Sequence, residues 1–335
     1  CLDAEGEEQE EMLLVRLTEK PIYYLFSLTP LVVFFVVVFC THLANMATNA
    51  PRVLVEYRLY RTLYALVAGG VLSVAGCLLQ SSLRNPLVDH YVLGIGSGAV
   101  FATYVAVLVL GYYSLLATAL AATAGGLLAL FLAVAIAERI SGSDVAYVLS
   151  GVSVATLFSG LSSFTYYYAV TRYRYASLLL VGSFVHSRPV YIWYITPPLL
   201  LVVFGYLYLS KKLNTLLLGD EYAMQLGVNP RTTRLLSSLI AGASSSIVVG
   251  FFGTIGFLGL VAPHIARFLL RTSDNRVVIP VASTTGMLLL YVTDVASRYI
   301  TAPLWGEVPA GSLVSLIGAP FFVALLLSRF SRRRV

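Results

Sequence analysis

The hydrophobic residues of this chain come in long uncharged blocks, each about as long as a lipid bilayer is thick. The first block covers residues 22–43 and contains nine consecutive apolar residues, at positions 31–39. Because a helix rises ~1.5 Å per residue, roughly 20 apolar residues cross the hydrocarbon core. The blocks are continuous and lack the alternation of barrel strands, so they predict membrane-spanning helices.

Ten such blocks follow one another along the chain. Only 11% of the residues are charged, and they lie mainly between the blocks. The sequence therefore predicts an all-α polytopic membrane protein with ten transmembrane helices. The blocks cover approximately residues 22–43, 60–82, 92–111, 114–137, 145–170, 190–209, 232–252, 255–270, 277–300 and 309–328.

The distribution of Lys and Arg predicts the orientation of these helices. With ten spans both termini share one side, and 15 of the 22 Lys and Arg residues fall on that side. Since cytoplasmic loops carry the excess of positive charge, both termini are expected in the cytoplasm of a cell-membrane protein. The net charge of +6 is thereby explained by topology, and we expect no nucleic-acid partner. Residues 1–20 are predicted to form an acidic cytoplasmic segment.

Two stretches five spans apart resemble each other. Arg61 is followed after six residues by Ala68-Gly69, and Arg234 is followed after six residues by Ala241-Gly242. Because the second stretch lies five spans after the first, an odd offset, the two copies run in opposite directions through the bilayer. Inverted repeats of this kind are typical of transporters, although chance similarity between apolar spans remains an alternative.

The longest polar interruption between spans contains a predicted short helix. Asp220 and Glu221 suit its first turn, where the helix dipole favours anions, and Gly227 can close it. Ala223 and Leu226, three residues apart, are expected on one face. The segment at about residues 216–229 is therefore predicted to be an amphipathic helix on the cytoplasmic surface, with a plain connector helix as the alternative.

Catalytic, metal-binding and nucleotide-binding patterns are missing from the sequence. The four histidines lie in separate regions, and the acidic residues fall in loops or at the edges of spans. No GxxxxGK[ST] motif occurs, so the chain is not expected to cradle ATP phosphates. We expect no bound cofactor and no enzymatic activity, and energy for transport would have to enter through a partner.

Five stretches resemble one family. They are Arg58-Leu59-Tyr60-Arg61, GCLLQSSLRNPLVDHYVLGIGSGA at 76–99, LGDEYAMQLGV at 218–228, GTIGFLGLVAPHIAR at 253–267 and EVPAGSLVSLIGAPFF at 307–322. Together they resemble the permeases of bacterial and archaeal type II ABC importers, which import iron(III)–siderophore complexes, haem and cobalamin. The resemblance implies that residues 21–335 form a transmembrane permease domain of ten helices with inverted repeats.

The resemblance also implies partners. The family forms homodimers with the pore on the twofold axis, above two ATPase subunits that bind ATP and Mg²⁺, and a substrate-binding protein docks from outside. The residues that match the ATPase-coupling helix are Leu218, Gly219, Asp220, Glu221, Ala223, Leu226 and Gly227. The docking arginines are Arg58, Arg61 and Arg298, and the cytoplasmic gate, within residues 140–145, includes Ser143 and Asp144. The small residues of span five expected along the pathway are Ser150, Gly151, Ser159 and Gly160.

Three departures from the family pattern leave the chelate open. Tyr60 stands where the family commonly has proline, and His90 replaces the proline of the NPLADP motif. The stretch before Gly182-Ser183, where the family often has a tryptophan, reads Leu178-Leu179-Leu180. An ion-coupled secondary transporter is the main alternative function, and the absence of ionisable residues at mid-membrane depth counts against it. An intramembrane enzyme would need a catalytic constellation that the sequence lacks.

Overall fold

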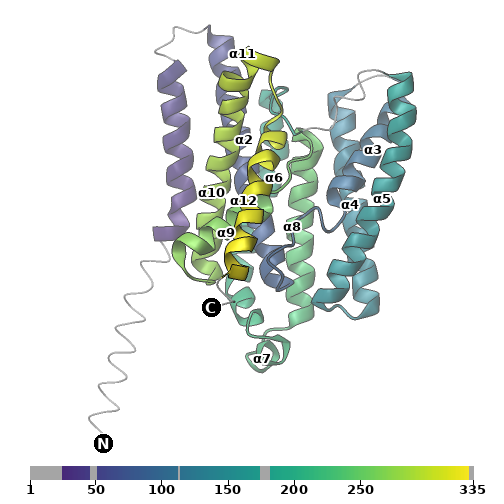
Figure 1. Cartoon of the computed structure of the whole chain (residues 1–335), viewed down its shortest axis with the longest axis vertical. Helices are drawn as coiled ribbons and strands as arrows, with labels where there is room; N and C mark the ends of the chain where they lie inside the picture. Colours follow the sequence, from purple (N-terminus) through teal and green to yellow (C-terminus); the bar gives the residue numbers. More distant parts are fainter. Residues whose placement is uncertain (1–24, 46–50, 112–113, 174–181, 332–335) are drawn as a thin grey trace, which may run out of the picture.

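The computed structural model describes residues 25–45, 51–111, 114–173 and 182–331, which form a bundle of helices (Figure 1). Each of the ten predicted blocks is helical, which confirms the predicted fold class. The acidic segment at residues 1–20 lies outside the described residues. The ten long helices are Leu25–Asn45, α2 (Arg52–Ser82), α3 (Ile95–Leu110), α4 (Leu115–Ile140), α5 (Asp144–Arg172), α6 (Ile192–Leu216), α8 (Pro230–Phe252), α9 (Leu258–Leu270), α10 (Asn275–Ala296) and α12 (Ala310–Ser331). The short ones are α7 (Asp220–Gln225) and α11 (Ala302–Trp305).

Seven helices of the described chain are long and apolar enough to cross a membrane, and three apolar helices are shorter. The three apolar helices below that length are α3, α9 and, within α12, Ala310–Pro320. Helices α3 and α9 begin a few residues after the start of their predicted blocks, and the chain before each of them is not helical. Residues 83–94 precede α3, and residues 253–257 precede α9. The predicted block at 255–270 therefore begins as loop and becomes helical only at Leu258.

Helix α2 forms the centre of the bundle and packs against α6, α8, α9 and α10. Small residues permit its close crossings. A β-carbon on Gly76 would overlap the carbonyl oxygen of Gly259 in α9, and one on Gly69 would overlap that of Gly286 in α10. Helix backbones approach this closely in membranes because association there depends on packing rather than on the hydrophobic effect.

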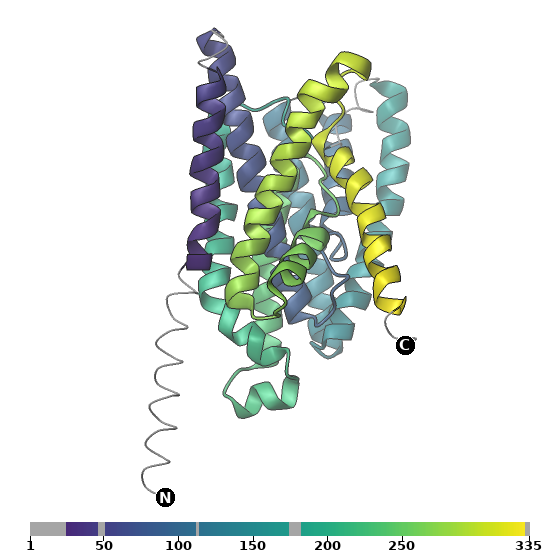
Figure 2. The same cartoon turned by 60° about the vertical axis from the view of Figure 1, so that its left-hand side comes forward.

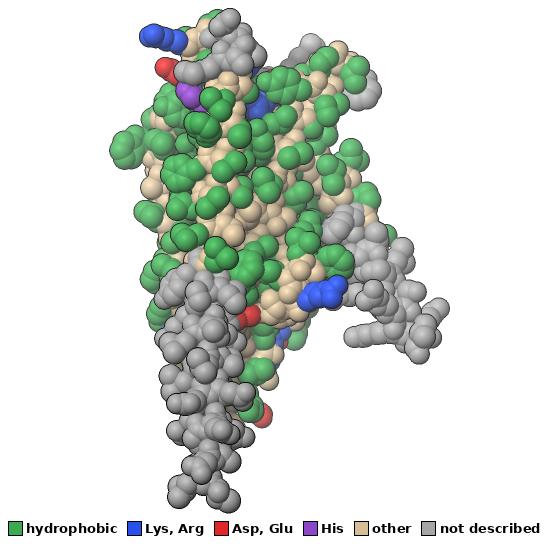
Figure 3. Space-filling view, turned by 90° about the vertical axis from the view of Figure 1, so that its left-hand side faces the viewer, with side chains coloured by type: hydrophobic (Ala, Val, Ile, Leu, Met, Phe, Trp, Pro, Cys, Tyr) green, Lys and Arg blue, Asp and Glu red, His purple; other side chains and the backbone are tan. Residues whose placement is uncertain are grey.

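The outer surface carries the pattern of a membrane protein. In the face shown in Figure 3, hydrophobic side chains cover the middle of the bundle, and charged side chains lie toward its two ends. The first helix contributes exposed apolar side chains, among them Leu31, Phe35 and Phe39. Exposed apolar area of this extent is stable only against lipid or protein. The chain is a multi-pass membrane protein.

Helix α7 lies outside the bundle at one end (Figures 1 and 2). The first helix begins at the end where α7 lies, and α12 finishes there. Helices α2 and α8, which carry the two similar stretches, run in opposite directions. This arrangement fits the expected inverted repeat and places Arg61 and Arg234 toward opposite ends of the bundle.

Candidate functional site

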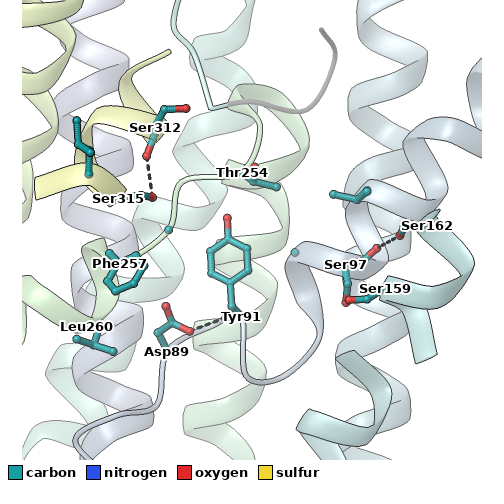
Figure 4. A pocket seen from close by; sticks show the side chains of 15 residues that line it. Asp89, Tyr91, Ser97, Ser159, Ser162, Thr254, Phe257, Leu260, Ser312 and Ser315 are labelled. Carbon is teal, nitrogen blue, oxygen red and sulfur yellow. Dashed lines mark hydrogen bonds between the residues drawn. The ribbon is translucent and has the colours of Figure 1, made fainter. Parts of the chain in front are cut away.

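A cavity of about 860 Å³ lies between α3 and α5 on one side and α9 and α12 on the other (Figure 4). Its walls combine hydroxyl groups, glycines and a few apolar side chains, with one carboxylate. The lining residues are Asp89, Tyr91, Gly96, Ser97, Val100, Ser159, Ser162, Thr254, Gly256, Phe257, Leu260, Gly311, Ser312, Ser315 and Leu316. The size suits a small-molecule cargo.

Non-helical backbone between α8 and α9 borders this cavity. Backbone hydrogen bonds connect three segments of the chain at this place. The Gly182 N–H donates to the Thr254 carbonyl at 3.1 Å, the Ser183 N–H donates to the Phe252 carbonyl at 2.8 Å, and the Gly311 N–H donates to the Gly182 carbonyl at 2.9 Å. Irregular backbone is tolerated inside a membrane where protein satisfies it or where it lines a cavity, and this segment meets both conditions.

Three of the five serines in the cavity wall donate their hydroxyls to nearby backbone carbonyls. The Ser162 hydroxyl lies 2.6 Å from the Phe158 carbonyl, and the Ser315 hydroxyl lies 3.0 Å from the Gly311 carbonyl. The Ser97 hydroxyl donates to the Gly94 carbonyl at 3.0 Å. Hydroxyls that already have a partner hold a passing solute weakly, so this wall suits movement more than tight capture.

Asp89 is the residue of this cavity that sequence reasoning missed. It was expected in an inner loop, but the 83–94 loop rises beside α9, and Asp89 lies next to Leu260 at the cavity (Figure 4). Leu260 is ten residues from the end of α9, or about 15 Å along the helix axis. The Asp89 Oδ1 accepts the Tyr91 N–H at 2.9 Å, and no hydrogen bond reaches Oδ2 from the described residues. A carboxylate therefore lies deep in the bundle, where we expected none.

The four predicted pathway residues divide into two pairs. Ser159 lines the cavity, and Gly160 is exposed with open space where a β-carbon would stand. Ser150 and Gly151 are buried by their own chain. A β-carbon on Gly151 would overlap the Val92 carbonyl oxygen. In this structure these small residues let the 83–94 loop pack onto α5, and a pathway role for Ser150 and Gly151 stays a prediction.

Helix α7 has the predicted acidic first turn, with Asp220 and Glu221. It follows Gly219, whose φ is 116°, and Gly227, whose φ is 77°, reverses the chain after it. The prediction that Ala223 and Leu226 share a face is wrong. Ala223 is fully buried, whereas Leu226 lies just beyond the helix and is 60% exposed.

The exposed side of α7 is formed by other apolar residues. Tyr222, Met224 and Leu226 each expose more than half of their surface, and Leu218 in the preceding turn is 65% exposed. We call Leu218, Tyr222, Met224 and Leu226 the α7 surface. Because it projects from the bundle at the end where charges gather, it is a candidate site for a protein partner.

The predicted gate residues begin α5. The Ser143 hydroxyl accepts the Ala146 N–H at 3.2 Å and caps the helix. The Asp144 carboxylate forms an ion pair with Arg84, whose Nη2 lies 2.8 Å from Oδ2. The structure thus places the gate segment at the same end of the bundle as α7.

The three arginines predicted for docking lie at the opposite end in different surroundings. Arg61 is 1% exposed, and its Nε donates to both carboxylate oxygens of Asp294, at 2.9 and 3.1 Å. Its Nη1 lies 3.0 Å from Glu307. The expectation of an exposed Arg61 is wrong, because α2 buries this guanidinium against α10. Arg58 is partly exposed and donates to Asn45, and Arg298 pairs with Asp294 at 3.1 Å.

Comparison with known proteins decides the family. Residues 23–328 match the FecCD transport family. The chain belongs to this family. It is 36% identical over 275 residues, 82% of this chain and 85% of the relative, to the Fe(3+) dicitrate transport system permease protein FecD of Escherichia coli K12. It is 35% identical over 286 residues, 81% and 72% of the two chains, to the cobalamin import system permease protein BtuC of Halobacterium salinarum.

A solved structure agrees with this assignment to the FecCD family. A metal-chelate type ABC transporter in an inward-facing conformation superposes with a TM-score of 0.77 and 26% identity, covering 92% of this chain and 99% of the other. The chain therefore has the type II ABC importer permease fold and belongs to the metal-chelate type of ABC permease. Its relatives are permease subunits, which makes this chain a transport subunit of an ABC importer.

Proposed function

We propose that this protein is the membrane permease of an ATP-driven importer that moves a metal chelate, an iron(III)–siderophore, haem or cobalamin, into the cytoplasm. The α7 surface is the observation that carries the proposal, because apolar side chains projecting beyond a membrane bundle need a protein partner. Two ATPase subunits would bind there and hold the ATP and Mg²⁺. The chain itself would bind no cofactor.

A second copy of the chain would complete the pathway. Beside the cavity, one face of α5 exposes small and hydroxylated residues to solvent or partner: Ser153, Thr156, Gly160 and Ser163. The Ser153 and Thr156 hydroxyls donate to their own helix at 2.8 Å. In a homodimer this face would lie on the twofold axis, with Ser159 of each subunit beside it and Ser143 and Asp144 closing the cytoplasmic end.

An extracytoplasmic substrate-binding protein would dock at the opposite end. Arg58 and Arg298 are partly exposed there, and their charges would serve association rate and register more than affinity. Arg61 would support this surface from below through Asp294 and Glu307. Exposed acidic side chains of the binding protein are the expected contacts.

The assembly can be tested on the purified protein. Co-expression with its cognate ATPase subunit should give a complex of two permease and two ATPase chains, as judged by light scattering after chromatography. Uptake by liposomes containing this complex, measured with iron(III) dicitrate, a trihydroxamate chelate, haem and cobalamin, would identify the cargo. A permease that remains monomeric and binds no ATPase would contradict the proposal.

The proposed topology has its own test. After replacement of Cys1 and Cys40, the substitution Ser273→Cys in the exposed α9–α10 loop should be labelled only from the cytoplasmic side. Arg52→Cys, at the exposed start of α2, should be labelled only from outside. An impermeant maleimide on intact cells and on inverted vesicles makes the comparison. Labelling of both positions from one side would refute ten spans with cytoplasmic termini.

Asp89 is proposed to discriminate between chelates by charge. At an effective dielectric constant of 20, a unit anion ~8 Å away is repelled by about 2 kcal/mol, or roughly thirtyfold in rate. Asp89→Asn keeps the oxygen that accepts the Tyr91 N–H and removes the charge. We expect uptake of an anionic chelate to rise relative to that of a neutral one.

The matched control for this charge effect is Ser97→Ala, which changes a neutral lining residue. Uptake of both chelates is measured for each variant under the same conditions. An unchanged ratio of anionic to neutral uptake in Asp89→Asn would refute the role in selectivity.

A further inference from the structure

Three elements of the cytoplasmic end meet at one guanidinium. Arg84 lies in the turn after α2, Asp144 begins α5 and Asp220 begins α7. The Arg84 Nη2 is 2.8 Å from Asp144 Oδ2 and 3.2 Å from Asp220 Oδ1. Arg84 therefore joins Asp144, the first residue of α5, to Asp220, the first residue of α7.

Asp220 has a second partner that fixes it to the bundle. The Arg234 Nη2 lies 2.6 Å from the same Asp220 Oδ1, and the Arg234 side chain is only 2% exposed. Arg234 is in the first turns of α8, which packs against α2, α4 and α6. The start of α7 is thus anchored on one side to α8 and linked on the other side to α5.

A second set of contacts joins α8 to the end of α4, just before the loop that connects α4 to α5. Arg231 forms an ion pair with the Glu138 carboxylate and donates to the Glu138 carbonyl at 2.9 Å. The Tyr147 hydroxyl donates to Glu138 Oε1 at 2.6 Å. Glu138 is near the end of α4, and Tyr147 is in the first turn of α5. The end of α4 is therefore connected to α8 through Arg231, and the start of α5 is connected to α7 through Arg84.

The backbone of Arg84 is unusual. Its φ is 46°, and only two other non-glycine residues in the described part of the chain have positive φ, Phe257 and Arg271. Glycine is the easier residue in this conformation. The arginine side chain at this position, bridging two carboxylates from different elements, is consistent with a functional reason for the strain.

The energetics of the Arg84 bridge suit a contact that changes. Arg84, Asp144 and Asp220 are each 25–36% exposed, so water screens their ion pairs and their contribution to stability is small. Such pairs can break and re-form without unfolding the bundle.

We propose that Arg84 is a positioning residue that transmits movement of α7 to the α4–α5 corner through the Asp220–Arg84–Asp144 bridge. The proposal rests on the proposed function, in which α7 receives the ATPase and residues 140–145 close the pathway. When the ATPase moves α7, the carboxylate of Asp220 carries Arg84 and Asp144 with it, and the start of α5 changes position.

The test is the variant Arg84→Gln in liposomes that contain the complete permease–ATPase complex. We expect the ATPase to bind and hydrolyse ATP as in the wild type, while uptake falls about tenfold, the size of a typical coupling between two sites. Arg84→Lys keeps the charge and should restore part of the uptake. Arg271→Gln is the matched control, because Arg271 has a φ of 52°, is exposed at the same end and forms no ion pair that the described residues show.

A second readout follows the gate itself. Val145 is 63% exposed and stands beside Asp144 without taking part in the bridge. With Val145→Cys, cross-linking between the two subunits should depend on nucleotide in the wild type and lose that dependence in Arg84→Gln. Normal uptake by Arg84→Gln would overturn the proposal. A fall in uptake that is accompanied by a lowered melting temperature would overturn it as well, because loss of folded protein would then explain the loss of uptake.

The wild-type complex separates the two possible failures. If it shows neither ATPase binding nor ATP-dependent uptake, the proposed function fails and the transmission role fails with it. If the wild type transports and Arg84→Gln transports equally well, only the role of Arg84 fails.

Discussion

Replacing Arg61 with methionine is expected to destabilise the protein by about 3–5 kcal/mol, the usual cost of removing one partner of a buried ion pair. The reason is the position of Asp294, which is 0% exposed and, among the described residues, would keep Arg298 alone as an ion-pair partner. Glu307 would lose its 3.0 Å contact with Nη1 as well. Unfolding in detergent, followed by heat or denaturant, measures the loss.

Two further variants make this prediction of a buried ion pair specific. Arg58→Met removes a partly exposed arginine from the same helix and should cost about 1 kcal/mol, since the loss that the described residues show is one hydrogen bond to Asn45. The double variant Arg61→Met, Asp294→Leu removes both charges and should recover much of the stability. If Arg61→Met unfolds like the wild type but binds the substrate-binding protein less tightly, the buried structural role is wrong and the docking role stands.

The second large effect is expected at the α7 surface. Met224→Asp and Leu226→Asp place a charge where an apolar partner surface should bind, and each should weaken ATPase binding by at least about 2 kcal/mol, the range of interface hot spots. That corresponds to a loss of roughly thirtyfold in affinity. The permease itself should fold normally, because both side chains are exposed. Binding of the purified ATPase to the solubilised permease measures the effect.

The control for this α7 prediction is Ser273→Asp, which adds the same charge to another exposed loop at the same end. Ala223→Asp is a poor probe, because Ala223 is fully buried and a charge there would disrupt the turn itself. Unchanged ATPase affinity in both Met224→Asp and Leu226→Asp would show that α7 is a connector and that the partner binds elsewhere.

The helices were predictable because their signal is local. An uncharged run of about 20 residues has few structures available to it in a bilayer, and the acidic first turn of α7 marks a helix start in the same local way. The late start of α9 was not predicted. The non-helical backbone before α9 is paired through Thr254, which accepts a hydrogen bond from Gly182, and Gly182 in turn accepts one from Gly311. Both glycines are distant from α9 in sequence.

Long-range contacts also explain the errors at the site. Arg61 resembles an interfacial arginine in sequence, and its burial depends on Asp294, 233 residues later. Asp89 resembles a loop residue, but the loop packs against α5 and α9 and brings it to the cavity. The error at Ala223 and Leu226 has a different cause, because α7 ends at Gln225 and helical spacing does not extend to residue 226.

The position of Asp89 also bears on the competing function. A mid-depth carboxylate is a feature of ion-coupled transporters, and the sequence alone predicts none in this chain. One carboxylate, without a described basic partner in the cavity, does not make a coupling site by itself. The source of energy for transport must therefore be measured directly.

Uptake of a metal chelate by liposomes containing the purified permease, with and without its ATPase subunit, tests the central claim most directly. The account predicts uptake only when the ATPase and Mg²⁺–ATP are both present on the cytoplasmic side, and it predicts no effect of ionophores that collapse proton and sodium gradients. Uptake by the permease alone, driven by an imposed ion gradient and abolished by those ionophores, would contradict it.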